Sequence, residues 1–408
     1  MRFSTLSSKK ILLGVTGSIA AYKAAELVRE LSRQDAAVTV VMTESAGKFV
    51  GRTTFNALSG SAVYTDLFNN PEEPAPHINL PRQADAVVIA PATANFIGKM
   101  AHGIADDLLS TIVLAAQKPI LVCPAMNSAM YEHPATKGNL EQLRKYGCQV
   151  VEPETGPLAC GDEGPGRLAE PSAICEAVKI ALEKKDLQGQ KILVTAGPTE
   201  EPIDPVRFIS NRSSGKMGYS LARVARRRGA EVVLISGPTC LSNPWGIEFV
   251  PVRTAAEMYK AVMSYFDWAT IVTKAAAVAD YGPSTVIPQK LKKGTPDLSL
   301  KLTRTPDILK ELGKRKKRQF LVGFAAESKN LAAEARRKLQ EKNLDLIVAN
   351  DITVPGAGFG FDTNQVKIIT ADGGIIDSPL LSKEEIAYLI LDKVLEVMQK
   401  LDKKVIKR

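Results

Sequence analysis

Residues 207–222, RFISNRSSGKMGYSLA, have the composition of a loop that binds phosphate. Glycines, serines and a lysine precede a segment of helical periodicity, and they follow residues 191–199, KILVTAGPT, which are typical of a buried strand ending in a turn. A Walker loop requires G-x-x-x-x-G-K-[ST], but Met217 follows the lysine here and Ser210 stands at the first glycine. The stretch is therefore no P-loop. Its composition leaves two interpretations open, a phosphate-binding loop and a serine-rich helix start.

A second glycine-containing turn, GVTGSIA, occupies residues 14–20. A dinucleotide site of the Rossmann type requires a third glycine in register and an acidic residue after the next strand. The third glycine is missing, and Thr43 stands at the position that would contact the ribose. Ser18, which we expect to cap the following helix, and the nearby amide groups suit a single phosphate. This favours a mononucleotide such as FMN over NAD, although the turn alone also fits an ordinary strand-to-helix connection.

Three further stretches carry groups suited to a flat ring and a reacting substrate. Residues 91–111 are rich in small and hydroxyl side chains, which let the backbone approach a ring closely. Residues 124–131, PAMNSAMY, contain Asn127, whose amide can bind a carboxylate. Residues 155–171, TGPLACGDEGPGRLAEP, surround Cys160 with glycines and prolines. That composition is typical of a movable flap.

The elements that must position these groups alternate between strand and helix. Apolar runs that end in small or polar residues predict strands, and helical periodicity over 20–31 and about 172–184 predicts helices between them. The pattern starts again after a charged, apolar-poor segment at 183–190. We therefore expect an α/β fold of two doubly wound, mainly parallel-sheet domains, 1–182 and 191–408, joined by that linker. Ligands should lie beyond the carboxyl ends of the strands. The sequence also predicts a hairpin around Asp372 and a last helix over about 383–400.

The composition of the 408 residues is that of an ordinary globular protein, with 45% hydrophobic and 24% charged residues. No apolar run is long enough for a membrane span, and five widely spaced cysteines predict neither disulfides nor a zinc site. We expect a reducing, cytoplasmic location without a membrane or nucleic-acid partner. The net charge of +9 comes largely from 310–320 and the C-terminal end, where we expect solvated helix ends.

The first half resembles the homo-oligomeric flavin-containing cysteine decarboxylases over residues 9–180. The resemblance is carried by GVTGSIAAYK, PATAN, GIADDLLST, PAMN and ACGDEGPGR, which occur in this order. It implies a flavodoxin-like trimer in which His77 acts from a subunit interface as base or orienting group, Asn127 holds the substrate carboxylate and Cys160 donates a proton. The residues that it implies for FMN are Gly17, Ser18, Ile19, Thr43, Ala92, Thr93, Ala94 and Asn95.

The chemistry that this resemblance implies accounts for those residue types. Loss of CO2 from a cysteine carboxylate needs a place for the electrons of the breaking bond. A flavin can oxidise the substrate thiol to a thioaldehyde, which accepts those electrons and becomes an ene-thiolate. Cys160 would then protonate it, because a thiol is mostly protonated at pH 7. His102 and Tyr131 stand where the family frequently has asparagine and tryptophan. Neither replacement affects a proposed catalytic group.

The second half resembles the bacterial, CTP-using phosphopantothenate–cysteine ligases. The resemblance is carried in order by TAGPTEEPIDPVRFISNRSSGKMG, TKAAAVADY, PQKLKK, TPDIL, GFAAES and NLDLIVAND. It implies a Rossmann-like, dimeric domain that forms an acyl-cytidylate with CTP and Mg2+, and Asn211 would carry this intermediate to product. No direct Mg2+ ligand is assigned. The residues that it implies for CTP are Lys274, Ala275, Ala276, Asp280, Lys290, Pro306, Asp307, Ile308, Leu309, Phe324, Lys338 and Lys342.

Lys290 is implied to touch the triphosphate and to act in formation of the acyl-cytidylate, whereas we expect Lys292 and Lys293 to face solvent. Lys338 and Lys342 lie four residues apart and share a helical face. Over about 9–400 the chain thus resembles the fused decarboxylase–ligase enzymes of coenzyme A synthesis. Their substrates are 4'-phosphopantothenate, cysteine and CTP, and a trimeric first domain joined to a dimeric second domain permits a dodecamer.

Two other interpretations remain open. One is that the second half has diverged into a binding module that regulates without catalysis, but the presence of Lys290, Asn211, Asp280 and Lys338 counts against this. Charge alone suggests a nucleic-acid-binding protein, but neither interspersed aromatic residues nor zinc-ligand spacing supports that class.

Overall fold

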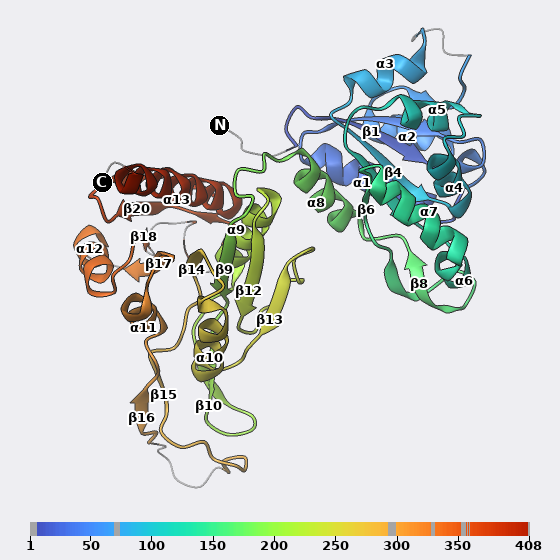
Figure 1. Cartoon of the computed structure of the whole chain (residues 1–408). Helices are drawn as coiled ribbons and strands as arrows, with labels where there is room; N and C mark the ends of the chain where they lie inside the picture. Colours follow the sequence, from blue (N-terminus) through green and yellow to red (C-terminus); the bar gives the residue numbers. More distant parts are fainter. Residues whose placement is uncertain are drawn as a thin grey trace. The chain divides into compact units, whose positions relative to one another are not determined.

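The computed structural model describes residues 6–68, 74–292, 299–327, 331–351, 356, 358 and 360–406. The chain divides into two compact units, Met1–Glu183 and Lys184–Arg408, and the junction lies within the segment expected as the linker. Each unit contains a mainly parallel sheet with helices on both faces, so the predicted fold class is confirmed (Figure 1). Among the described helices, none has the length and apolar character needed to cross a membrane.

The first unit is built on a six-stranded parallel sheet with the order β3-β2-β1-β4-β5-β6. The edge strand β3 has only two residues, and without it the order matches the flavodoxin-like 2-1-3-4-5 arrangement. The direction of winding reverses between β1 and β4, which opens a crevice at their carboxyl ends. The strands are β1 (Lys10–Val15), β2 (Ala37–Met42), β3 (Val63–Tyr64), β4 (Ala86–Ala92), β5 (Ile120–Pro124) and β6 (Gln149–Val150).

Helices cover both faces of this sheet (Figure 1). Helix α1 presents Ala24, Leu27, Val28 and Leu31 to the core, as its periodicity predicts, and it packs against α2 and α8. On the other face α3 packs against α5, and α4 against α7. The helices are α1 (Ala21–Arg33), the 3-10 turn η1 (Ala46–Lys48), α2 (Arg52–Ser59), α3 (Pro76–Gln83), α4 (Ala94–His102), α5 (Leu108–Ala115), α6 (Ser128–Glu132), α7 (Pro134–Lys145) and α8 (Pro171–Leu182).

The glycine-rich stretch around Cys160 forms an antiparallel hairpin of β7 (Glu154–Pro157) and β8 (Glu163–Arg167). Its base is attached to the turn after β5, where the Met126 amide donates to the Gly166 carbonyl at 3.0 Å. A Cβ at Gly166 would lie 2.2 Å from the Met126 carbonyl oxygen, and Gly166 has φ +134. Only glycine permits this close approach. The sequence therefore places the tip of the hairpin, with Cys160, beside the turn that carries Asn127.

The second unit has an eight-stranded sheet with the order β13-β12-β9-β14-β17-β18-β20-β21. Its first six strands are parallel and follow the Rossmann order, which again reverses beside the first strand, β9. The predicted hairpin around Asp372 is confirmed as the antiparallel pair β20–β21. The strands are β9 (Lys191–Ala196), β12 (Glu231–Ser236), β13 (Glu248–Pro251), β14 (Ile271–Lys274), β17 (Phe320–Glu327), β18 (Leu346–Asp351), β20 (Val366–Thr370) and β21 (Ile375–Asp377).

Two helices pack on one face of this sheet and three on the other. Leu221, Val224 and Ala225 of α9 are buried, as predicted. Arg227 on the same helix is also buried, and its guanidinium donates to Glu384 at 2.6 Å, which attaches α9 to α13. The helices are α9 (Lys216–Arg227) and α13 (Lys383–Ile406) on the first face, and α10 (Ala255–Phe266), α11 (Ile308–Arg315) and α12 (Leu331–Glu341) on the second.

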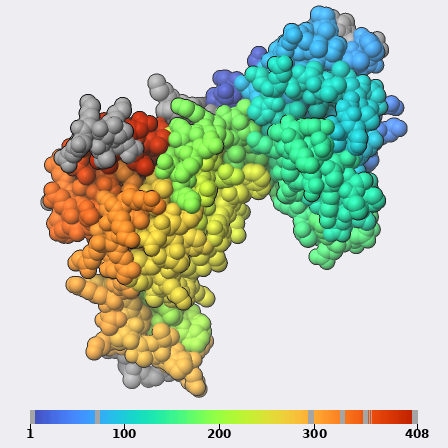
Figure 2. Space-filling view, in the orientation of Figure 1, coloured from blue at the N-terminus to red at the C-terminus, as the bar shows by residue number. Residues whose placement is uncertain are grey.

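Short antiparallel pairs extend the second unit beyond its main sheet. The pairs β10 (Glu200–Pro202) with β11 (Phe208–Ser210), and β15 (Tyr281–Pro283) with β16 (Leu302–Arg304), contact each other through β10 and β15. Together they form an arm that projects from the body of the unit, seen in Figure 1 and as the lowest part of Figure 2. A third pair, β19 (Thr363–Asn364) with β22 (Leu381–Ser382), lies before α13.

Candidate active sites

A cavity of about 550 Å³ lies at the carboxyl ends of the central strands of the first unit. It includes Thr16 after β1, Thr43 after β2 and Thr93 after β4, which is where the winding rule places a ligand. Two residues expected for FMN lie elsewhere, because Ala92 is fully buried in β4 and Ile19 lines a neighbouring cavity. The expected residues that do line this cavity are Gly17, Ser18, Thr43, Thr93, Ala94 and Asn95.

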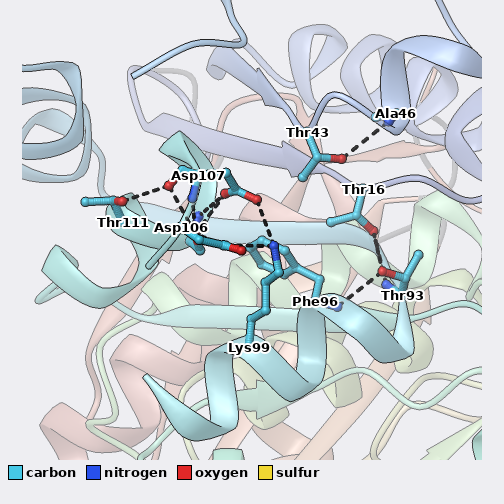
Figure 3. A network of polar contacts seen from close by, with 10 residues as sticks. Thr16, Thr43, Ala46, Thr93, Phe96, Lys99, Asp106, Asp107 and Thr111 are labelled. Atoms are coloured by element: carbon cyan, nitrogen blue, oxygen red, sulfur yellow. Dashed lines mark hydrogen bonds and ion pairs between the residues drawn. The ribbon is translucent and has the colours of Figure 1, made fainter. Parts of the chain in front are cut away.

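Threonine hydroxyl groups hold the loops of this cavity together (Figure 3). Thr16 Oγ1 donates to the Pro91 carbonyl at 2.7 Å and accepts from the Thr93 amide at 3.1 Å. Thr93 Oγ1 in turn accepts from the Phe96 amide and caps α4. The turn after β1 is thereby attached to the turn after β4. These bonds fix the floor of the cavity before any ligand binds.

The start of α1 has the character of an anion site. The expectation that Ser18 caps this helix is wrong, since α1 begins at Ala21 and its N-cap residue, Ala20, makes no side-chain capping bond. Ser18 Oγ instead accepts from the Ala20 amide at 3.3 Å, within the turn itself. A helix start without a side-chain cap can bind a phosphate through its amide groups. The cavity volume and this start therefore fit a mononucleotide.

Lys99 also lines this cavity, but its charge is balanced by two carboxylates (Figure 3). Its Nζ lies 2.7 Å from Asp106 Oδ1 and 3.4 Å from Asp107 Oδ2. The hydrogen bond to Asp106 raises the pKa of Lys99, and the same bond lowers the pKa of Asp106. A ligand phosphate would thus depend on the backbone near Ser18 rather than on this cation. Sequence reasoning overlooked the ion pairs, although GIADDLLST contained two of the three partners.

A second cavity of about 560 Å³ contains Asn127 and Cys160 and shares Ser18, Ala125 and Met126 with the first. The two cavities are therefore adjacent. Asn127 Oδ1 accepts from the Ala129 amide at 2.8 Å and caps α6. Because this bond uses the amide oxygen, the amide nitrogen is directed towards the hairpin. Asn127 Nδ2 donates to Cys160 Sγ at 3.2 Å.

Asp162 joins this pair, and sequence reasoning did not identify it. Asn127 Nδ2 donates to Asp162 Oδ2 at 2.7 Å, and the Cys160 thiol donates to the same oxygen at 3.3 Å. Asp162 lies two residues after Cys160 in the quoted motif, but its position beside Asn127 depends on how the hairpin folds. Its carboxylate lies where Asn127 was expected to hold the carboxylate of a substrate. A substrate bound in that way would have to displace Asp162.

Within one chain, the fold does not place His77 in the cavity that contains Cys160. It lies on α3, partly buried, and does not line either of the two cavities of the first unit. Within the described part of the chain, its Nδ1 atom is buried without a hydrogen-bond partner. Its catalytic role stays a prediction that requires a second subunit.

A cavity of about 490 Å³ in the second unit collects most of the residues expected for CTP. They come from the end of β14 and the loop after it, the turn before α11 and the start of that helix, strand β17 and the region of α12. Lys338 and Lys342 both line it, as their four-residue spacing predicts. The expected residues found here are Lys274, Asp280, Pro306, Asp307, Ile308, Leu309, Phe324, Lys338 and Lys342.

Asp307 organises one wall of this cavity. Its Oδ1 accepts from the Lys310 amide at 3.0 Å and caps α11, and its Oδ2 lies 2.9 Å from Lys342 Nζ. Burial by itself would raise the pKa of the Asp307 carboxyl, but the bonds from Lys342 and the Lys310 amide hold it below its ordinary value. Lys342 is thus held over the cavity as a cation. Such a group suits an anionic ligand.

A second cavity of the second unit contains part of the stretch 207–222. It is lined by Asn211 and the Ser213–Gly218 stretch together with Ala275 and Ala276, and it shares Lys274, Asp280, Phe324 and Lys338 with the CTP cavity. Asn211 Nδ2 donates to the Ala277 carbonyl at 2.8 Å. The serine- and glycine-rich stretch therefore meets the end of β14. It lies beside the lysines expected to bind a nucleotide.

Lys290 does not line these cavities of the second unit. It is exposed and lies on the arm, where the Leu291 amide donates to the buried Asp204 at 3.1 Å. Burial would raise the pKa of Asp204, but backbone hydrogen bonds, first from Val206, hold it below its ordinary value. Its role with the triphosphate stays a prediction. Lys292 is exposed, as expected, and Lys293 lies outside the described residues.

Within the described ranges, no three histidine, cysteine or acidic side chains gather in a way that could hold a metal ion. All five cysteines are free. Cys123 and Cys175 are core residues, and burial raises the pKa of Cys175 to about 12.

Comparison with known proteins agrees with both halves of the sequence interpretation. A family model described as Flavoprotein matches residues 3–183, and one described as DNA/pantothenate metabolism flavoprotein C-terminal domain matches residues 187–398. The coenzyme A biosynthesis bifunctional protein CoaBC of Bacillus subtilis (strain 168) is 51% identical, covering 95% of this chain and 97% of that protein. The protein of the same name from Escherichia coli (strain K12) is 46% identical, covering 96% and 97%.

Among solved structures, the C-terminal domain of a coenzyme A biosynthesis bifunctional protein CoaBC is 45% identical, with a TM-score of 0.46, and covers 54% of this chain and 100% of its own. The curated relatives match nearly the full length of this chain, and the two family models together span both units. The chain therefore belongs to the family of coenzyme A biosynthesis bifunctional proteins CoaBC.

Proposed function

We propose that the chain catalyses two consecutive steps of coenzyme A biosynthesis. The second unit ligates cysteine to 4'-phosphopantothenate at the expense of CTP, and the first unit decarboxylates 4'-phosphopantothenoylcysteine to 4'-phosphopantetheine. The observation that carries this proposal is 51% identity to a bifunctional relative over 95% of the chain. The adjacent cavities in each unit, which contain nearly all of the residues expected for these reactions, support it.

In the first unit, the cavity at the start of α1 is our candidate for FMN, with its phosphate on the backbone near Ser18. When bound, FMN supplies the electron sink that the oxidation of the substrate thiol requires. Asn127 exchanges the Asp162 carboxylate for that of the substrate and orients it towards the flavin cavity. Cys160, 3.2 Å from Asn127, is then placed to donate a proton to the carbon that has lost CO2.

In the second unit, the lysines of the CTP cavity neutralise the triphosphate so that the substrate carboxylate can attack its α-phosphorus. Pyrophosphate leaves, and an acyl-cytidylate remains. The amine of cysteine then attacks the acyl carbon, and CMP leaves with the electrons of the broken bond. Mg2+, when bound together with CTP, would supply further positive charge against the triphosphate.

We further propose that the protein is a cytoplasmic homo-oligomer with a trimeric first domain, a dimeric second domain and possible assembly as a dodecamer. His77 supports this for the first domain, since its buried Nδ1 lacks a partner in the described chain and it does not line that unit's cavities. Light scattering coupled to gel filtration measures the mass. A monomer that is fully active in decarboxylation would exclude the intersubunit role of His77.

Replacing Lys342 with methionine should raise the KM for CTP by ~10- to 100-fold, because one charge-assisted contact to a phosphate is lost. Steady-state kinetics with varied CTP provide the measurement. Lys314→Met is a matched control, since Lys314 lies exposed on α11. Equal KM values in the two variants would remove Lys342 from nucleotide binding.

The proposed function is tested by incubating the purified protein with 4'-phosphopantothenate, cysteine, CTP and Mg2+. We expect 4'-phosphopantetheine, CO2 and pyrophosphate to form in equal amounts. We also expect a yellow preparation from which heat releases one FMN per chain, identified by mass spectrometry. A colourless protein that does not take up FMN would refute the first-half assignment, and a lack of CTP-dependent pyrophosphate release would refute the second.

A further inference from the structure

Among the lysines that line the CTP cavity and the cavity of Asn211, only Lys274 and Lys338 line both. Lys274 is the last residue of β14, a central strand that pairs with β9 and β17. Its Nζ donates to the Ala276 carbonyl at 2.9 Å. Asn211 donates to the next carbonyl, that of Ala277, at 2.8 Å. The amine thus lies at the junction of the two cavities, and Lys274 and Asn211 donate to neighbouring carbonyls of the loop after β14.

The surroundings of Lys274 favour its neutral form. Burial lowers its pKa to about 8, and the cations Lys342 and Lys338 on the α12 side add to this effect. Asp307 before α11 and Asp280 after β14 oppose it. An anion close to a lysine raises its pKa. A bound triphosphate would therefore keep Lys274 protonated, and the departure of pyrophosphate would return it to a state that can release and accept protons near neutral pH.

Amide formation requires a group that accepts a proton from the cysteine nitrogen. The amine of cysteine is largely an ammonium ion at neutral pH, and an ammonium nitrogen has no electron pair with which to attack the acyl-cytidylate. The nitrogen loses two protons between ammonium ion and amide. One passes to the departing CMP phosphate as the carbon–nitrogen bond forms and the bond to the CMP oxygen breaks, and the other must leave before the nitrogen can attack. A neutral amine within reach of the acyl carbon can accept that proton and become an ammonium ion.

We propose that Lys274 is the general base of the ligation, accepting the proton of the cysteine ammonium group as cysteine attacks the acyl-cytidylate. The inference rests on the proposed function of the second unit. It assigns Lys274 a role in the second half-reaction in addition to the contact with CTP expected from the sequence. The position at the junction of the cavities places the base between the nucleotide that leaves and the amine that arrives.

The test measures the two half-reactions separately in the full chain carrying Lys274→Arg, which keeps the charge but cannot act as a base near neutral pH. Pyrophosphate release without cysteine reports formation of the acyl-cytidylate, and rapid mixing with cysteine reports its aminolysis. At pH 7 we expect aminolysis to fall by ~100-fold and pyrophosphate release by less than ~10-fold. Raising the pH should restore aminolysis, since cysteine then loses its proton to solvent.

Hydroxylamine distinguishes a base from a structural residue. It is already uncharged at neutral pH, so it needs no base, and it should trap the acyl-cytidylate of Lys274→Arg at nearly the unmodified rate. Lys260→Arg, an exposed lysine on α10, is the control and should behave as the unmodified protein in every assay. Unchanged aminolysis by cysteine, or an equal loss with hydroxylamine, would overturn the proposal.

The unmodified protein provides a second test if the variant releases no pyrophosphate. Its aminolysis by cysteine should rise as the pH is raised through neutrality, whereas trapping by hydroxylamine should stay flat over that range. Parallel profiles for the two nucleophiles would exclude the base. Failure of the unmodified protein itself to release pyrophosphate from CTP would instead refute the proposed function, so the two failures are distinguishable.

Discussion

Cys160→Ser lowers the formation of 4'-phosphopantetheine by ~1,000-fold and leaves an oxidised, decarboxylated form of the substrate. Removal of a positioned general acid typically costs ~100- to 10,000-fold in rate. A serine hydroxyl is a far weaker acid than a thiol, so the ene-thiolate would lose its proton donor while the earlier steps continue. The geometry supports this role, because Cys160 Sγ lies 3.2 Å from the amide expected to hold the substrate carboxylate.

Rapid quenching followed by mass spectrometry should detect this intermediate as a species that has lost CO2 and two further hydrogens relative to the substrate. Cys240→Ser is a suitable control, since Cys240 is an exposed, free cysteine in the second unit. Pyrophosphate release should be unchanged in Cys160→Ser, because that reaction uses the other unit. Full turnover of the variant would show that Cys160 is not the proton donor.

Asn211→Asp should allow the acyl-cytidylate to form but slow its conversion to the amide by ~100-fold. In the structure the Asn211 amide nitrogen donates to the Ala277 carbonyl at 2.8 Å. An ionised aspartate cannot donate this bond, and it adds a negative charge beside the position expected for the departing CMP. Losing this hydrogen bond costs ~0.5–1.5 kcal/mol, and repulsion between the new carboxylate and the nucleotide phosphate adds to the expected loss.

The measurement is a burst of pyrophosphate without the matching amount of amide. Unlike Lys274→Arg, this variant should not recover at high pH, and hydroxylamine should react slowly with its intermediate, because the defect lies in the loop and its charge rather than in a missing base. Asn243→Asp, at an exposed asparagine, is the control. Equal yields of pyrophosphate and amide in Asn211→Asp would rule out the proposed role.

Much of the fold was predictable because strands and helices produce characteristic patterns of apolar residues over short stretches of sequence. The apolar periodicity of Ala24, Leu27, Val28 and Leu31 predicted the buried face of α1, and it is confirmed. The start of that helix was not predictable from local capping rules. Ser18 has the residue type of an N-cap, but its amide donates to the Thr16 carbonyl at 2.9 Å in a separate turn, so the helix begins three residues later.

The candidate sites were predictable where residues directly follow parallel strands. Thr43, Thr93 and Asn127 each follow a strand of one sheet, and all strands of a parallel sheet end at the same edge, so their side chains meet there. Asp162 was overlooked because it lies on a hairpin outside the sheet. The packing of Gly166 against Met126 decides where that hairpin lies.

By itself the sequence determined the two doubly wound sheets, the residue types at their carboxyl edges and, through its ordered motifs, the family. The tertiary structure alone decided that Asp162 accepts a hydrogen bond from the Asn127 amide, that two carboxylates form ion pairs with Lys99, and that Lys274 lines two cavities at once. The physical reason is the distance along the sequence between the groups that determine each property. Periodicity and turn chemistry depend on neighbours a few residues apart, whereas the protonation and partners of a side chain depend on groups that only folding brings within a few ångströms.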